Sequence, residues 1–325
     1  MLQRFRLEDG SLVHDKSGES PVLVYINPDV RERNELQEAF KIDSHTLSSA
    51  LDPDEVSRVE FNHDRLIVIW KHPANLSGKD SYSFDVTSVG LLLFKERLVI
   101  ISSDDLHMID GEGFGAHELN SLLDVILELL FKTIQDYTVH LKTIKSTAKE
   151  LQLKINTSFA NKHLIQMFNL SEGLVYFING IGGNSAVLTK LRNHAEKEQL
   201  SAHTIAFIDD LIIENTQCYG QAATYSTIFA GLMDARGNII NNNMNILIRN
   251  LTLINIVFLP LNLIASIGGM SEFTMMTEGI DWRISYTLFS FALLVIGGLT
   301  AFVLKKIGFG GTAVRTTKIK FFHKT

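Results

Sequence analysis

The sequence predicts an α/β cytoplasmic domain followed by long stalk helices and two C-terminal transmembrane α-helices. Before residue 105, short β-branched and aromatic segments alternate with polar turns. Apolar residues then recur at helical spacing, and two nearly uncharged segments of membrane-spanning length stand near the end. We expect a cytoplasmic α/β domain over 1–115, a helical stalk over 116–245, transmembrane helices over 246–270 and 284–304, an extracytoplasmic acidic loop over 271–283 and a basic tail over 305–325.

The composition narrows the classes of function. The chain has 325 residues, is 46% hydrophobic and carries a formal net charge of −6, which is ordinary for one or two globular domains. Its one cysteine, Cys218, cannot form an intrachain disulfide, which suits a reducing compartment. The sequence has no P-loop, dinucleotide-binding glycine pattern, zinc-ligand cluster or nucleophile–base set. We therefore expect membrane transport rather than an enzyme, without a cofactor or a nucleic-acid partner.

The sequence pattern of the N-terminal domain predicts a mixed sheet with helices between its strands. Runs of β-branched and aromatic residues, bounded by polar turns, predict strands. The expected strands are Val22 to Ile26, Arg58 to Asn62, Arg65 to His72, Ser83 to Phe94 and Arg97 to Ser103, with helices over Arg31 to Phe40 and Ser44 to Leu51.

Three long helices are expected in the stalk. Leucine and isoleucine recur every three or four residues from about Leu119 to Ile144. A second helix is expected over roughly Asn161 to Phe177, where the glycine-rich "NGIGGNS" should break it. A third begins near Ser201 and meets no proline until Pro260, so it can run from the cytosol into the first membrane span.

Charge predicts the orientation of the two spans. Two soluble core helices could be equally apolar, but these lie side by side near the C-terminus and are followed by basic residues. The start, "MLQRFRLEDGSLVHD", has no apolar core of signal-peptide type, so both termini are expected in the cytoplasm and membrane lipids are expected partners. The tail either binds anionic lipid or only sets topology. Its basic residues are Lys305, Lys306, Arg315, Lys318, Lys320 and Lys324.

One face of the first predicted span is largely polar. Steps of three or four residues place its members on one side of a helix, and polar side chains facing lipid are costly. The face either packs against other helices or lines water, and a water path would need several copies around an axis. Uncharged amides suit hydrated Mg²⁺, because they accept hydrogen bonds from its water without trapping the ion. The face comprises Asn245, Ile248, Thr252, Asn255, Leu259, Asn262, Ser266 and Gly269.

The segment "VFLPLNLIASIGGMSEF", with a second span and Lys-Lys behind it, resembles the CorA family of divalent-cation channels. The segments "LDPDEVSRVEFNHDRLIVIWKH" and "DVTSVGLLLFKERLVIIS" are similar to strands of that family's cytoplasmic domain. The resemblance implies a funnel-shaped homopentamer in a bacterial-type inner membrane. It implies pore-lining roles for Asn245, Ile248, Leu259 and Asn262, an acidic inner mouth at Asp234, and regulatory Mg²⁺ between cytoplasmic domains held by Asp209 or Asp210 and by Asp80.

The chain departs from the family at the outer selectivity filter. Family members carry Gly-Met-Asn there, whereas this chain has Gly269, Met270 and Ser271. Ser271 either replaces the asparagine or belongs to the next position after a deletion. Glu272, Glu278 and Asp281 keep the loop acidic enough to concentrate cations. We expect a channel for Mg²⁺, with Co²⁺ and Ni²⁺ as further candidates; the alternatives are a zinc-transporting relative and a non-conducting membrane-anchored sensor or scaffold.

Overall fold

The computed structural model describes residues 1–8, 10–15, 20–74, 84–104, 119–157, 161–304 and 306. The chain divides into two compact units, Met1–Leu232 and Met233–Thr325. Helix α6 (Ala202–Gly268) contributes residues to both. Asp80 and most of the expected basic tail lie outside the described residues.

The first unit contains a seven-stranded sheet in the order β2-β1-β3-β7-β6-β5-β4. The strands β3 and β7 are parallel, and all other neighbours are antiparallel. The five strands expected from the sequence are confirmed to within a few residues at each end, whereas two strands near the N-terminus were missed. The bounds are β1 Leu2–Glu8, β2 Ser11–His14, β3 Val22–Ile26, β4 Arg58–Phe61, β5 Arg65–Pro73, β6 Val86–Phe94 and β7 Leu98–Ser102.

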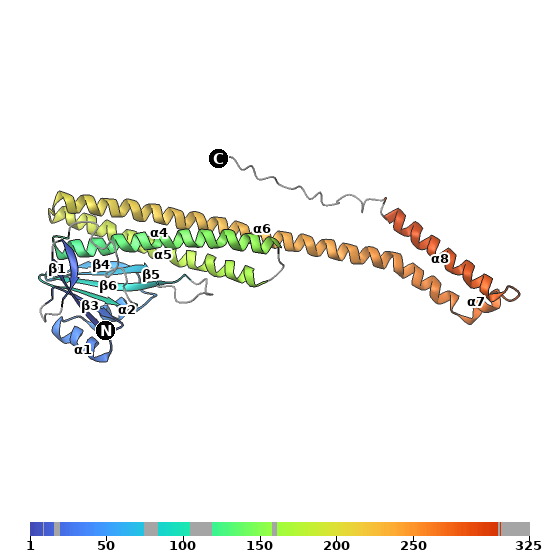
Figure 1. The fold of residues 1–325 in the computed structure, drawn as a ribbon, viewed down its shortest axis with the longest axis horizontal. Coiled ribbons are helices and arrows are strands. Elements are labelled where there is room, and N and C mark those ends of the chain that lie inside the picture. The colour runs from blue at the N-terminus through green and yellow to red at the C-terminus, as the bar shows by residue number, and fades with distance from the viewer. Residues whose placement is uncertain are drawn as a thin grey trace. The chain divides into compact units, whose positions relative to one another are not determined.

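Two short helices and their core cover one face of the sheet (Figure 1). They are α1 (Val30–Ala39) and α2 (Ser44–Leu51), both as the sequence predicts. Asp29 caps α1, since its carboxylate accepts a hydrogen bond from the Glu32 amide at 2.8 Å and its own amide donates to the Glu32 side chain at 3.0 Å. This cap satisfies amides that the first turn of α1 leaves without partners.

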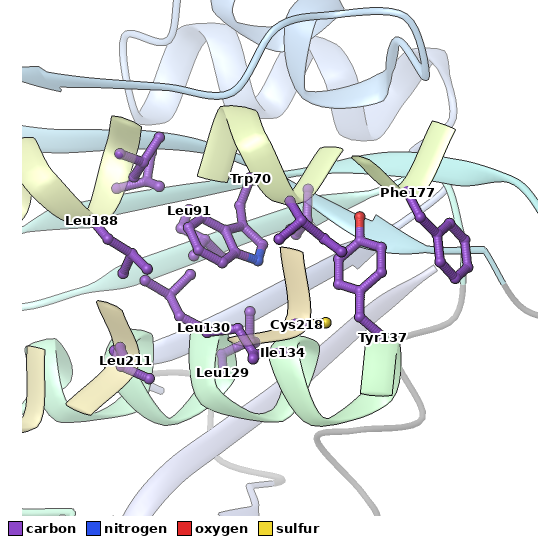
Figure 2. Packing of buried hydrophobic residues seen from close by; sticks show 14 of the residues in the cluster. Trp70, Leu91, Leu129, Leu130, Ile134, Tyr137, Phe177, Leu188, Leu211 and Cys218 are labelled. Atoms are coloured by element: carbon purple, nitrogen blue, oxygen red, sulfur yellow. The ribbon is translucent and has the colours of Figure 1, made fainter. Parts of the chain in front are cut away.

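Long helices pack on the other face of the sheet. They are α4 (Leu122–Thr157), α5 (Asn161–Lys197) and the first part of α6. Figure 2 shows their shared core, in which Trp70 and Leu91 of the sheet lie among Tyr137, Phe177 and Leu188 of the helices. This continuous apolar core makes the sheet and the helices one folded unit.

The expected break after Phe177 is wrong, because α5 continues through "NGIGGNS" to Lys197. The glycines there let α5 approach the sheet closely. A Cβ at Gly180 would lie 2.7 Å from the Tyr137 hydroxyl, and one at Gly183 would lie 2.9 Å from the Ser57 hydroxyl. Tertiary packing therefore overrides the low helix propensity of glycine.

The second unit contains the end of α6, the short helix α7 (Ser271–Met276) and α8 (Trp282–Leu304). Both α6 and α8 are long and apolar enough to cross a membrane. The turn between them, expected as a loop, includes the helix α7. Helix α8 begins two residues before the expected Ile284.

Candidate functional site

The face of α6 that packs on α8 is apolar and distinct from the polar stripe. A Cβ on Gly268 would clash with the ring of Phe289, and a Cβ on Gly297 would lie 3.0 Å from Cδ1 of Leu261. These contacts show where α8 lies against α6. The α6 positions that are shielded on this side are Leu253, Val257, Leu261, Ile264 and Gly268.

The polar stripe lies on the opposite side of α6. At about 3.6 residues per turn, its centre is roughly half a turn from the face that packs on α8. All seven candidate pore-lining side chains are exposed in the isolated chain: Asn245, Ile248, Thr252, Asn255, Leu259, Asn262 and Ser266. No described part of its own chain therefore covers the stripe.

The hydrogen bonds of the stripe leave its acceptors available. The Thr252 hydroxyl donates to the Ile248 carbonyl at 2.9 Å, and the Ser266 hydroxyl donates to the Asn262 carbonyl at 2.8 Å. These bonds satisfy the hydroxyl protons within the helix and leave oxygen lone pairs free. The side-chain amides of Asn245, Asn255 and Asn262 make no hydrogen bond within the part of the chain that the structure describes. Because such amides are costly against lipid, this face suits water or another copy of the chain.

An aromatic cluster holds the turn after α6 against α8. The ring of Phe273 lies 5.9 Å from Tyr286 and 5.1 Å from Phe289, and the Tyr286 hydroxyl donates to the Gly268 carbonyl at 3.4 Å. Edge-on and tilted ring pairs of this kind add to the stability gained by burial. The turn that carries the candidate filter is therefore fixed from one side. Sequence reasoning missed this cluster, although Tyr286 and Phe289 are one helical turn apart.

The candidate filter residues are on the surface of this turn. The Gly269 amide donates to the carbonyls of Ala265 and Ser266, each at 3.2 Å, which closes α6. Met270 precedes α7, and Ser271 is its first residue. All three filter residues, Gly269, Met270 and Ser271, are exposed.

The three acidic residues of the outer turn are also exposed. Asp281 has a structural role, because its side chain accepts a hydrogen bond from the Arg283 amide at 2.9 Å. Glu272 and Glu278 make no ion pair among the described residues. All three carboxylates can still contribute negative potential at this end of the unit.

The expected regulatory carboxylates differ in their surroundings. The Asp209 carboxylate accepts a hydrogen bond from Nε of Arg192 at 2.7 Å, and this bond raises the pKa of the Arg192 guanidinium. Asp210 is exposed and makes no ion pair in the described part of the chain. Asp234 is exposed in the second unit, and Asp80 lies outside the described residues. No group of three or more potential metal ligands occurs among the residues described.

A family model decides the relationship of the chain to known proteins. The model described as "CorA-like Mg2+ transporter protein" matches residues 23–306. The chain belongs to this family. As a CorA-like membrane protein it is a transporter by family, in agreement with the expectation that it is not an enzyme.

Two CorA relatives match most of the chain. The cobalt/magnesium transport protein CorA of Methanocaldococcus jannaschii is 25% identical over 282 residues, which is 81% of this chain and 86% of that protein. The protein of the same name from Thermotoga maritima is 23% identical over 274 residues, covering 83% and 77% of the two chains.

A solved CorA structure confirms the fold. The complete structure of the CorA magnesium transporter from M. jannaschii has a TM-score of 0.73 and 20% identity, and the match covers 94% of this chain and 97% of that one. An α/β domain, long helices and two C-terminal apolar helices are therefore the fold of this CorA-like chain.

Proposed function

We propose that this CorA-like chain assembles as a homopentamer and conducts Mg²⁺ through a pore lined by the polar stripe of α6. The observation that carries the proposal is the orientation of the stripe. Its amides and hydroxyls lie opposite the α8 contact, so the chain's own second span does not cover them. Because polar groups are unfavourable against lipid, an assembly around a central axis gives the stripe a water-filled surface.

The chemistry of the stripe suits a hydrated divalent cation. Asn245, Asn255 and Asn262 supply amide oxygens, and Thr252 and Ser266 supply hydroxyl oxygens whose protons are already bonded within α6. Such oxygens accept hydrogen bonds from the polarised water around Mg²⁺. Since the stripe has no carboxylate, the ion is attracted without being bound too tightly to leave.

The outer turn supplies the entrance in this proposal. Glu272, Glu278 and Asp281 raise the local concentration of cations, and Gly269, Met270 and Ser271 form the filter. In this proposal the chain lies in a bacterial-type inner membrane, and both termini face the cytoplasm. The relatives' names, which include cobalt, support Co²⁺ as a second cargo.

Regulation by bound metal is proposed at Asp210. Mg²⁺ shared between neighbouring cytoplasmic domains would hold the pore closed. Asp210 suits this role better than Asp209, whose carboxylate already binds Arg192. Asp80 and Asp234 remain further candidate ligands. Asp210→Asn should weaken the protection from protease that Mg²⁺ gives the cytoplasmic domain. Unchanged protection would exclude Asp210 as a ligand of the regulatory Mg²⁺.

The direct test is metal uptake into sealed vesicles that contain the purified full-length chain. Uptake of Mg²⁺, Co²⁺, Ni²⁺ and Zn²⁺ is compared with that of protein-free vesicles. The proposal expects Mg²⁺ uptake that competing Co²⁺ reduces. Uptake of Zn²⁺ alone would favour the zinc-transporting relative, and a stable pentamer without uptake of any ion would favour a sensor or scaffold.

A further inference from the structure

Arg283 is an isolated basic residue at the start of α8. It is the one lysine or arginine in the sequence from residue 250 to residue 304. Its guanidinium carbon lies 5.5 Å from the centre of the Trp282 ring, within the range of a cation–π contact. The guanidinium makes no ion pair with a carboxylate among the described residues, and Asp281 accepts a hydrogen bond from the Arg283 backbone amide.

The Arg283 side chain borders an open groove of about 550 Å³ along one side of α8. Trp282, Arg283, Tyr286 and Thr287 line its outer end, and Ser290 is followed by Phe291 and Leu294 toward the middle of the helix. Its lining therefore changes from cationic and aromatic to apolar along the direction in which α8 crosses the membrane.

This groove lies beside the contact between α6 and α8. Tyr286 joins the two features, because its ring packs on Phe273 and its hydroxyl donates to the Gly268 carbonyl. No described element of the second unit covers the rest of the groove, since Trp282 is 67% exposed and Leu294 is 76% exposed. An occupant of the groove would therefore contact the elements that fix the turn after α6.

A phospholipid has the chemistry that matches the groove from end to end. Tryptophan and tyrosine favour the headgroup level of a bilayer, and a guanidinium binds phosphate oxygens through paired hydrogen bonds. An acyl chain fits the apolar end at Phe291 and Leu294. Charge also favours this occupant, because the Arg283 guanidinium has no carboxylate partner among the described residues and attracts an anionic headgroup.

We propose that Arg283, together with the neighbouring Trp282, binds the phosphate of an anionic phospholipid in the outer leaflet, with the Tyr286 ring beside the headgroup and one acyl chain along the α8 groove. The proposal rests on the membrane topology in the proposed function, although not on ion conduction. The bound lipid neutralises Arg283 and braces the aromatic cluster that holds the candidate filter.

The two tryptophans of the chain allow a direct measurement. Trp70 is fully buried in the sheet core, whereas Trp282 is largely exposed. The full-length protein is placed in phosphatidylcholine vesicles containing a minor fraction of brominated phosphatidylglycerol or brominated phosphatidylcholine. Tryptophan quenching then reports which lipid lies near Trp282, and the Trp282→Phe variant gives the residual Trp70 signal.

The expected result is a preference of about fivefold for the anionic lipid, as one basic residue near a charged lipid surface supplies. Arg283→Gln should abolish this preference, Arg283→Lys should keep part of it, and Lys306→Gln should leave it unchanged. Equal quenching by both lipids, or a preference that survives Arg283→Gln, would overturn the proposal.

A second measurement needs no variant. Short-chain phosphatidylglycerol and inorganic phosphate are each titrated against the wild-type protein in detergent while Trp282 emission is followed. Saturable change with the lipid alone supports the site, and a response to neither ligand, or an equal response to both, contradicts it. Neither measurement requires flux, so a non-conducting protein could still possess the lipid site.

Discussion

Asn184 of α5 and Lys71 of β5 are joined by a pair of hydrogen bonds between a side chain and a backbone. Oδ1 of Asn184 accepts from the Lys71 amide at 3.0 Å, and Nδ2 of Asn184 donates to the Lys71 carbonyl at 2.8 Å. The Ser57 hydroxyl donates to the same Oδ1 at 2.9 Å. One buried amide therefore ties the long helix to strand β5 through two bonds and to the segment before β4 through a third.

Asn184→Ala should destabilise the first unit. Removal of the amide leaves three buried polar groups without this partner, at a cost of about 1–3 kcal/mol for each unsatisfied group. Urea unfolding of the full-length protein, followed by Trp70 fluorescence in a Trp282→Phe background, measures the change. The matched control is Asn179→Ala in the same helix, where the side chain is exposed. Equal losses in the two variants would contradict the assigned role of Asn184.

Two glycines in the same stretch should respond oppositely to alanine. At Gly180 the new Cβ would lie 2.7 Å from the hydroxyl of the fully buried Tyr137, and such overpacking costs about 1–3 kcal/mol. At Gly182 the nearest atom is in the Tyr219 ring at 3.5 Å, so alanine should be neutral or stabilise the helix by up to about 1 kcal/mol. Thermal unfolding of both variants tests this ordering, and a more stable Gly180→Ala protein would refute it.

These two glycines also explain one limit of sequence reasoning. "NGIGGNS" has the composition of a helix break, and its contacts with Ser57, Tyr137 and Lys71 are distant in sequence. Strand β1 was missed for a related reason. Its Arg4, Arg6 and Glu8 give the segment a polar pattern, and Phe5 is its one fully buried residue.

The core strands and the polar stripe could be predicted, because both depend on local periodicity. Strands such as β5 and β6 are apolar over most of their length, and the three- and four-residue steps along α6 define a face without knowledge of its surroundings. The ion pair of Asp209 with Arg192 joins two helices, and no helical periodicity reports it. Likewise, the sequence could not show which side of α6 packs on α8.

His72 should make the first unit sensitive to acid. Burial lowers the pKa of His72 from 6.5 to about 4, and its Nδ1 is 3.1 Å from the Pro73 carbonyl oxygen. Between these two pH values the unfolded chain binds the proton more tightly, so stability should fall by up to about 3 kcal/mol as the pH drops from 6.5 to 4. His72→Leu should flatten this part of the profile in urea unfolding, and the exposed His63→Leu should not. If the wild-type and His72→Leu proteins lose stability equally in acid, His72 is not the source of the acid sensitivity.

Ser271 can be aligned with the asparagine of Gly-Met-Asn or with the residue after it, and uptake measurements can distinguish the two alignments. If Ser271 replaces the asparagine, Ser271→Asn should increase Mg²⁺ uptake relative to Co²⁺ several-fold, because about 1 kcal/mol of added discrimination is roughly fivefold. If a residue has been lost, insertion of asparagine between Met270 and Ser271 should have that effect instead. Vesicle uptake with both ions distinguishes the two alignments. If neither variant changes the ratio of Mg²⁺ to Co²⁺ uptake, this turn is not part of the selectivity filter.

We propose that the polar face of α6, opposite α8, lines the path of the ion. Asn245 lies on that face, whereas Asn250 continues the series of residues on the side of α8, and both side chains are exposed in the isolated chain. The most direct measurement compares initial Mg²⁺ uptake into vesicles by Asn245→Leu and Asn250→Leu at equal protein content. We expect a fall of about tenfold, equivalent to roughly 1.4 kcal/mol in the barrier, for Asn245→Leu. Uptake by Asn250→Leu should stay near the wild-type rate, and equal uptake by the two variants would contradict a pore along the polar face.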